Sequence, residues 1–102
     1  MPKCLLLKLN INHTTIRWYY YTYFRSQGVD IVSVENEKKE VIIYEDEGEL
    51  CNVYTKADTI IIKTKSTYYP SRKPIKVPKE VYSFKIILDT TASNDEYRFR
   101  PK

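Results

Sequence analysis

Hydrophobic and polar positions alternate with a period of two in several short segments, a pattern typical of strands with one buried face. In the first, Cys4–Ile11, alternate residues from Leu5 to Ile11 are apolar and lie on the same side. Charged or turn-forming residues separate the segments and predict hairpins between neighbours. The other predicted strands are the apolar runs Asp30–Val34 and Glu40–Tyr44, together with Leu50–Thr55, Thr59–Lys65, Lys85–Asp89 and Glu96–Arg100.

One segment follows a helical period instead. Between Thr14 and Gln27, aromatic and apolar residues recur three and four positions apart, and Gly28 suits the end of a helix. We therefore expect a helix over Thr14–Gln27, which would leave Trp18 and Tyr21 partly exposed. Because Tyr and Phe favour strands, a strand is the alternative.

The most unusual stretch is Trp18–Phe24, in which six of seven residues are aromatic. Aromatic side chains are large hydrophobic groups, and Tyr and Trp also carry a polar tip. A chain of 102 residues can neither expose nor bury all six. The stretch is therefore expected to supply both core and one adhesive surface.

A proline-rich arm follows the predicted strand Thr59–Lys65. Pro70, Pro74 and Pro78 stand four positions apart, which forbids a regular helix and predicts an extended chain. Pro78 could open a single helical turn that ends at Tyr82.

A shift of 55 positions superimposes similar segments of the two halves. Leu5–Lys8 then aligns with Ile60–Lys63, and Ile31–Val32 aligns with Ile86–Ile87. The sequence thus predicts one domain of α+β class over residues 1–102. It would consist of two similar strand–crossover–hairpin motifs, about 3–50 and about 51–102, packed about a pseudo-twofold axis. The alternative is a plain α+β domain without duplication.

Composition supports a globular protein with an uneven charge. The chain is 42% hydrophobic and 14% aromatic, which argues against disorder. It has no apolar run of about 18 residues, so we expect no membrane span, and the short leucine run near the start is not a signal peptide. The net charge is +4, but residues 1–50 carry −2 and residues 51–102 carry +6. A basic stretch can attract phosphate, although a solvated face is the commoner explanation.

The sequence contains no recognisable catalytic or cofactor motif, so we expect neither enzymatic activity nor a bound cofactor. His13 is the single histidine, and it stands in a polar, cap-like context. Two glycines cannot form a phosphate-binding loop. Cys4 and Cys51 are not spaced as metal ligands, and both lie in apolar segments that suggest buried thiols.

Two binding functions remain. The first is a protein- or peptide-binding module whose groove lies between the two motifs and receives an extended peptide. Its predicted contact residues are Trp18, Tyr21, Tyr68, Tyr69, Arg72 and Lys73. The alternative is nucleic-acid binding through the basic, tyrosine-bearing segment 63–79. Its predicted contact residues are Lys63, Lys65, Arg72, Lys73, Lys76 and Lys79.

The length, the aromatic run Trp18–Phe24 and the charged, tyrosine-rich composition resemble small proteins of filamentous viruses of hyperthermophilic archaea. The resemblance carries no functional motif. It implies expression in the cytoplasm of an infected archaeal cell, with the virion as a second location, and a host or viral protein as partner. It also raises the expectation of a disulfide between Cys4 and Cys51, because such cells tolerate intracellular disulfides.

Overall fold

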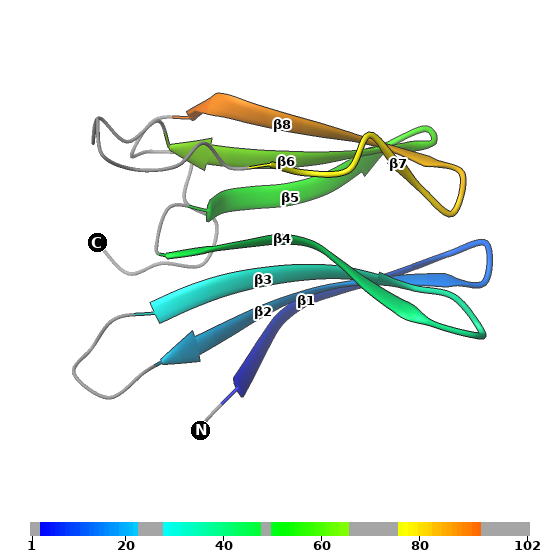
Figure 1. Ribbon diagram of the computed structural model, residues 1–102, viewed down its shortest axis with the longest axis horizontal. Helices are drawn as coiled ribbons and strands as arrows, with labels where there is room; N and C mark the ends of the chain where they lie inside the picture. The colour runs from blue at the N-terminus through cyan, green and yellow to red at the C-terminus, as the bar shows by residue number, and fades with distance from the viewer. Residues whose placement is uncertain (1–2, 23–27, 48–49, 66–75, 93–102) are drawn as a thin grey trace.

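The computed structural model describes residues 3–22, 28–47, 50–65 and 76–92. This part of the chain is all-β and consists of two four-stranded sheets stacked as a sandwich (Figure 1). The first sheet has the order β1-β2-β3-β4, and the second has the order β5-β6-β8-β7. The strands are β1 (Lys3–Ile11), β2 (Thr14–Thr22), β3 (Gly28–Glu35), β4 (Glu40–Glu47), β5 (Leu50–Lys56), β6 (Thr59–Lys65), β7 (Glu80–Val81) and β8 (Phe84–Ala92).

The predicted α+β class is therefore wrong. The expected helix Thr14–Gln27 is strand β2 over its described residues, which confirms the alternative. Its side chains alternate between faces: Ile16 and Trp18 are buried, whereas Arg17 and Tyr19 are half-buried. Aromatic residues occupy both faces of β2, so they match the helical spacing and the strand spacing equally well. The pairing of β2 with β1 and β3 along its length decides for the strand.

Gly28 opens β3 instead of ending a helix. A side chain at this position would collide with the ring of Tyr20. The Tyr20 side chain thus occupies the space beside Gly28, and a larger residue there would require the ring to move.

The two sheets differ in topology, so the predicted pair of strand–crossover–hairpin motifs is also wrong. The first sheet is an antiparallel meander without a crossover, in which β1 and β3 lie on either side of β2. In the second sheet, β6 and β8 are direct and parallel neighbours. The expected helical turn from Pro78 to Tyr82 contains β7 and a tight turn. The other predicted strands are confirmed except Glu96–Arg100, which lies outside the described residues.

Both sheets contribute to one hydrophobic core. The largest side chain in it is Trp18, which is 1% exposed. Each fully buried aliphatic or aromatic side chain stabilises the fold by about 1.5–3 kcal/mol. The other core residues are Ile16, Val32, Val34, Ile43 and Tyr44 of the first sheet and Leu50, Val53, Ile60, Ile62, Phe84 and Ile86 of the second.

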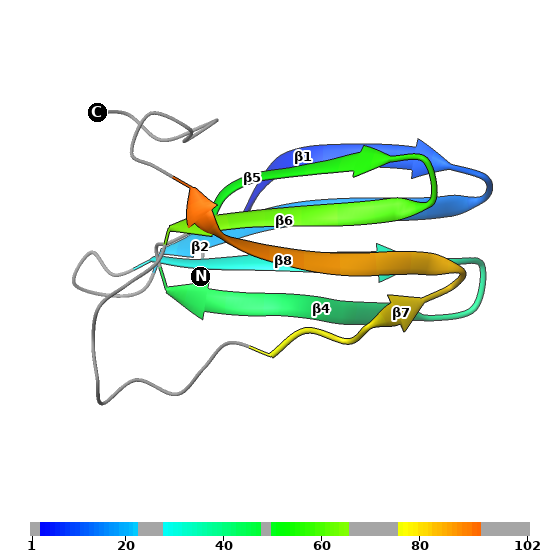
Figure 2. The same cartoon turned by 90° about the horizontal axis from the view of Figure 1, so that it is seen from above.

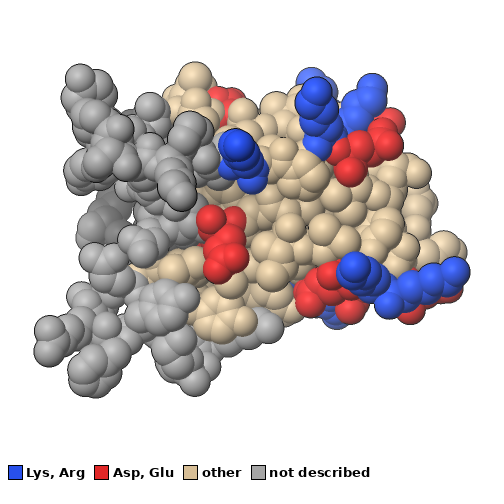
Figure 3. Space-filling model, viewed as in Figure 1, with Lys and Arg blue, Asp and Glu red and all other residues tan. Residues whose placement is uncertain are grey.

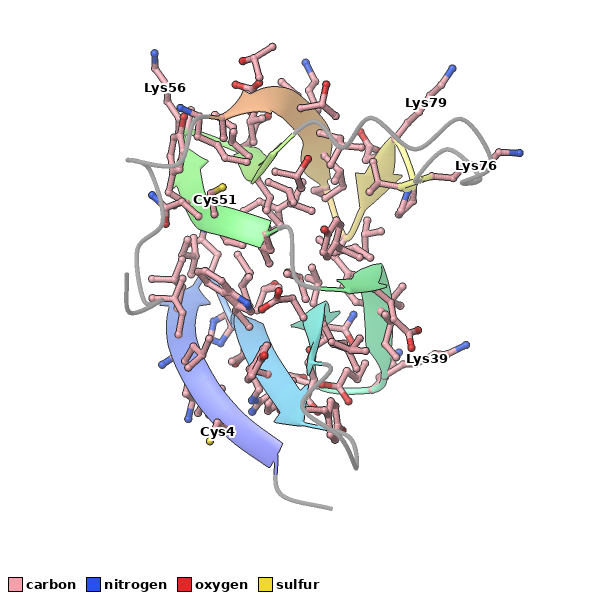
Figure 4. The ribbon with its side chains drawn as sticks, turned by 90° about the vertical axis from the view of Figure 1, so that its left-hand side faces the viewer. Cys4, Lys39, Cys51, Lys56, Lys76 and Lys79 are labelled. Atoms are coloured by element: carbon pink, nitrogen blue, oxygen red, sulfur yellow. The ribbon has the colours of Figure 1, made fainter. Side chains whose placement is uncertain are left out.

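The two cysteines are not joined. Cys4 of β1 is exposed, whereas Cys51 of β5 is buried, and they belong to different sheets (Figure 4). The bridge that the resemblance suggests is therefore absent, and a buried thiol is confirmed only for Cys51. No helix in the described ranges is long and apolar enough to cross a membrane.

Candidate functional site

The predicted peptide site is not assembled in the structure. Trp18 points into the core, where its indole Nε1 donates a hydrogen bond of 2.9 Å to Oδ1 of Asp30. The expectation of a partly exposed Trp18 is therefore wrong. Tyr21 is half-buried and lies on the opposite face of β2, because side chains alternate along a strand. The remaining predicted contact residues are Tyr68, Tyr69, Arg72 and Lys73, which lie outside the described residues.

The lysines predicted to contact nucleic acid are dispersed. Lys76 and Lys79 are exposed and point away from the second sheet (Figure 4). Lys63 is half-buried on β6 and stands in register with Asp89 of β8. Lys65 ends β6, but its side chain is outside the described set, as are Arg72 and Lys73.

Asp89 carries a lowered pKa. The main cause is a hydrogen bond of 2.6 Å from the Thr91 hydroxyl, followed by a bond of 2.9 Å from the Thr91 backbone N–H. The positive charge of Lys63 lowers the pKa further. Asp89 therefore stays ionised beside Lys63 and reduces the positive potential there, which weakens the case for phosphate binding by Lys63.

The structure places a different candidate site at one end of the sandwich. The turns β1–β2, β3–β4, β5–β6 and β7–β8 all lie at this end, which we call the turn end (Figures 1 and 2). Three of them surround a pocket of about 400 Å³ that receives residues from both sheets. Its lining residues are Asn12, His13, Thr14, Asn36, Glu37, Lys38, Tyr82 and Ser83.

Two of these turns hold an unusual backbone conformation. Asn12 and His13 have φ of 51° and 64°, and Tyr82 and Ser83 have φ of 50° and 71°. Two consecutive positive φ values in a two-residue hairpin loop define a type I′ turn, which normally takes Asn-Gly. A residue with a Cβ costs about 1–2 kcal/mol in this region. Such strain is often kept where it positions functional groups, so it points to the turn end as a site.

The third turn is held by its own asparagine. Asn36 Oδ1 accepts hydrogen bonds from the backbone N–H groups of Lys38 at 2.9 Å and Lys39 at 3.1 Å. The backbone N–H of Asn36 donates to the Lys39 carbonyl at 3.2 Å. These bonds hold the β3–β4 turn in a defined conformation through contacts of its own residues.

A hydrogen bond connects the two sheets beside the pocket. The Tyr82 hydroxyl donates to the backbone carbonyl of Lys39 at 2.9 Å. It ties the β7–β8 turn of the second sheet to the β3–β4 turn of the first. The strained conformation of Tyr82 thus places its ring at the boundary between the sheets.

The pocket carries charged side chains of both signs together with a histidine and a serine. His13, Glu37 and Lys38 are exposed, and opposite charges lie close together at this end (Figure 3). Within the described residues no hydrogen bond joins His13 to Ser83, so the pair lacks the contact that activates a nucleophile. No cluster of metal-ligating side chains occurs in these parts of the chain either.

Sequence reasoning missed this pocket because its turns resemble other features. Asn12–Thr15 is consistent with a helix cap, and Tyr82 is the last residue of the predicted helical turn. A gap of two residues between neighbouring strands indicates a hairpin turn. This signal can be used for Asn12-His13 only if residues 14–22 are recognised as a strand. No protein family, curated protein sequence or solved structure matches the chain.

Proposed function

We propose that the protein is a non-enzymatic recognition module that binds a short segment of another protein in the pocket at the turn end. The observation that carries this proposal is the convergence of three turns, from both sheets, around one polar pocket. As in the predicted groove, the binding site lies between the two halves of the chain. Its lining residues are different, and Trp18 supports the site from the core without contacting the partner.

The composition of the pocket resembles that of antibody paratopes. Those surfaces are rich in Tyr, Ser and Asn, because Tyr gives large contact area at low entropic cost and Ser and Asn give adaptable hydrogen bonds. Tyr82, Ser83, Asn12 and Asn36 supply the same groups here. The volume of about 400 Å³ suits a few side chains of a loop or peptide.

The charges of the pocket favour a protein partner over nucleic acid. Glu37 and Lys38 are adjacent and opposite in sign, so the pocket lacks the concentrated positive charge that phosphate binding needs. The proposed ligand is therefore a polar peptide segment of mixed charge. A host or viral origin of this partner stays a prediction from the resemblance.

Selection from a random peptide library against the immobilised protein tests the proposal. Enriched peptides should lose at least about tenfold in affinity on the double variant His13→Ala with Lys38→Ala, because two central contacts are removed. The matched control is Lys56→Ala with Asp58→Ala, in the β5–β6 turn at the same end but outside the pocket. This control should bind like the wild type.

Two results would contradict the proposal. One is a selection that enriches no peptide, and the other is a peptide whose affinity the pocket variant leaves unchanged. A parallel titration with single-stranded and duplex DNA at two salt concentrations tests the alternative. Tight binding that falls steeply with salt and is lost in Lys76→Ala with Lys79→Ala would favour nucleic acid instead.

A further inference from the structure

The strand β7 is much shorter than the other strands of the second sheet. It consists of Glu80 and Val81, which pair with the first two residues of β8 (Figure 2). Beside this pairing, the backbone N–H of Ile86 donates to the Lys79 carbonyl at 3.0 Å. β5 and β6 have seven residues each. A strand that is paired over so few residues opens locally at a lower free energy than the rest of its sheet.

The turn after β7 weakens this short pairing further. Tyr82 and Ser83 have φ of 50° and 71°, a region in which the Cβ atom is crowded. The strain offsets part of the stability that the pairing with β8 provides. Val81 and Tyr82 are half-buried and pack against the core from its margin. We call residues 80–83 the β7 lid.

The β3–β4 turn, which faces the β7 lid from the first sheet, is held by its own hydrogen bonds. Asn36 Oδ1 accepts bonds from the backbone N–H groups of Lys38 and Lys39. The Lys39 carbonyl accepts two further bonds, from the Asn36 N–H at 3.2 Å and from the Tyr82 hydroxyl at 2.9 Å. The Tyr82 hydroxyl therefore binds an oxygen atom that the opposite turn already holds in place. Of the two sides that this bond connects, the β7 lid is the one able to move.

We propose that the β7 lid opens and closes beside the pocket, and that the Tyr82–Lys39 hydrogen bond is the latch that keeps it closed. The structure shows the closed form, in which Tyr82 and Ser83 line the pocket. In the open form the latch and the pairing of β7 with β8 are broken, and the strain of the turn is released. The pocket then loses the residues that the second sheet contributes to it.

The lid supplies a means of regulating the proposed peptide site. This consequence rests on the proposed function, whereas the opening of the lid does not. A peptide that contacts Tyr82 or Ser83 binds the closed form and shifts the population towards it. The open fraction lowers the apparent affinity, so a change that favours the closed form should tighten binding.

Amide hydrogen exchange, followed by NMR on the protein without peptide, tests the lid. Two adjacent residues of β8 provide the comparison. The Ile86 N–H donates to Lys79 on the side of the lid, whereas the Lys85 N–H donates at 2.9 Å to the Asp58 carbonyl on the other side. Relative to the intrinsic rate of each amide, Ile86 should exchange at least about tenfold faster than Lys85, because only its bond breaks when the lid opens.

Two variants should change the exchange of Ile86 in opposite directions. Tyr82→Phe removes the latch hydroxyl and keeps the ring, so exchange should become about fivefold faster. Ser83→Gly relieves the strain of the closed turn, so exchange should become about two- to fivefold slower. Tyr54→Phe is the matched control, because it removes a tyrosine hydroxyl from β5, away from the lid, and should leave the rate of Ile86 unchanged.

Two further amides show which part of the molecule moves. Lys85, on the other side of β8, and Lys38, which Asn36 holds, should exchange at unchanged rates in all three variants. Equal rates for Ile86 and Lys85 in the wild type, or no effect of Tyr82→Phe on Ile86, would overturn the proposal. An acceleration that Lys85 or Lys38 shares would also overturn it, since the opening would then extend beyond the lid. These measurements contain no peptide, so a failure of the proposed function leaves them unaffected.

Discussion

The Trp18–Asp30 hydrogen bond stabilises the interior of the sandwich by joining neighbouring strands β2 and β3. Asp30 is 0% exposed, so its carboxyl group depends on protein donors in place of water. Leaving a buried polar group without a hydrogen-bond partner costs about 1–3 kcal/mol. Trp18 is thus a structural residue, through both its hydrogen bond and its apolar volume.

We expect Trp18→Phe to lower the free energy of unfolding by about 2–4 kcal/mol, because the indole donor is lost and a cavity forms. Chemical denaturation measures this value. Tyr54→Phe, on the half-buried outer side of β5, is the control and should change stability by less than about 0.5 kcal/mol. At temperatures where Trp18→Phe is folded, its affinity for a selected peptide should equal that of the wild type. A large loss of affinity would instead show that Trp18 contributes to peptide binding.

Asp89 gives a second residue-scale prediction, on pH. Because its folded-state pKa is lowered, Asp89 stabilises the protein above its unfolded-state pKa, and this contribution is lost as the pH falls through the folded-state value. Thr91→Val removes the hydroxyl donor and should raise the pKa of Asp89 while leaving the backbone bond in place. An NMR titration of the carboxyl carbon follows this change. Thr90→Val, at the exposed neighbouring position, should leave the pKa where it is.

At the scale of elements, β2 shows how far sequence pattern alone can lead. Of the strands on either side of it, Cys4–Ile11 is predicted by its alternating residues and Asp30–Val34 by an apolar run that ends in a charged turn. In β2, tyrosines fill both faces, since their rings pack on apolar neighbours while the hydroxyl reaches water. The hydrophobic period of this segment is therefore ambiguous between helix and strand. The strand is decided by its pairing with β1 and β3, which the local sequence does not reveal.

The turns provide the prediction at this scale. His13→Gly places glycine at a position with φ of 64° and should stabilise the protein by about 0.5–1 kcal/mol, because the strain is removed. Ala57→Gly is the matched control, since Ala57 also has a positive φ of 55° but does not line the pocket. Both variants should raise the melting temperature, and only His13→Gly should weaken peptide binding. Equal effects of the two variants on binding would show that His13 has no role in recognition.

At the scale of the whole molecule, the described turns of the two sheets meet at the turn end. The described turns are short and gather at one end, where the Tyr82–Lys39 hydrogen bond connects the sheets.

The location of the site could not be predicted from the sequence, although most strands could. Asn12 and Tyr82 are 70 positions apart, and they meet only because two sheets of different topology stack with their turns aligned. The internal similarity at an offset of 55 residues suggested related halves, but apolar strands resemble one another whatever their order in a sheet. The proposed pocket, like the predicted groove, is a binding site between the two halves of the chain. It is lined by different residues.

The most direct test of the account is an NMR titration of the isotope-labelled protein with a library-selected peptide. The account predicts that backbone amide shifts concentrate at residues 12–14, 36–39 and 82–83, the three turns around the pocket. Residues of the β5–β6 turn, at the same end, should shift much less. Shifts that instead concentrate on the outer face of either sheet would contradict a recognition site at the turn end.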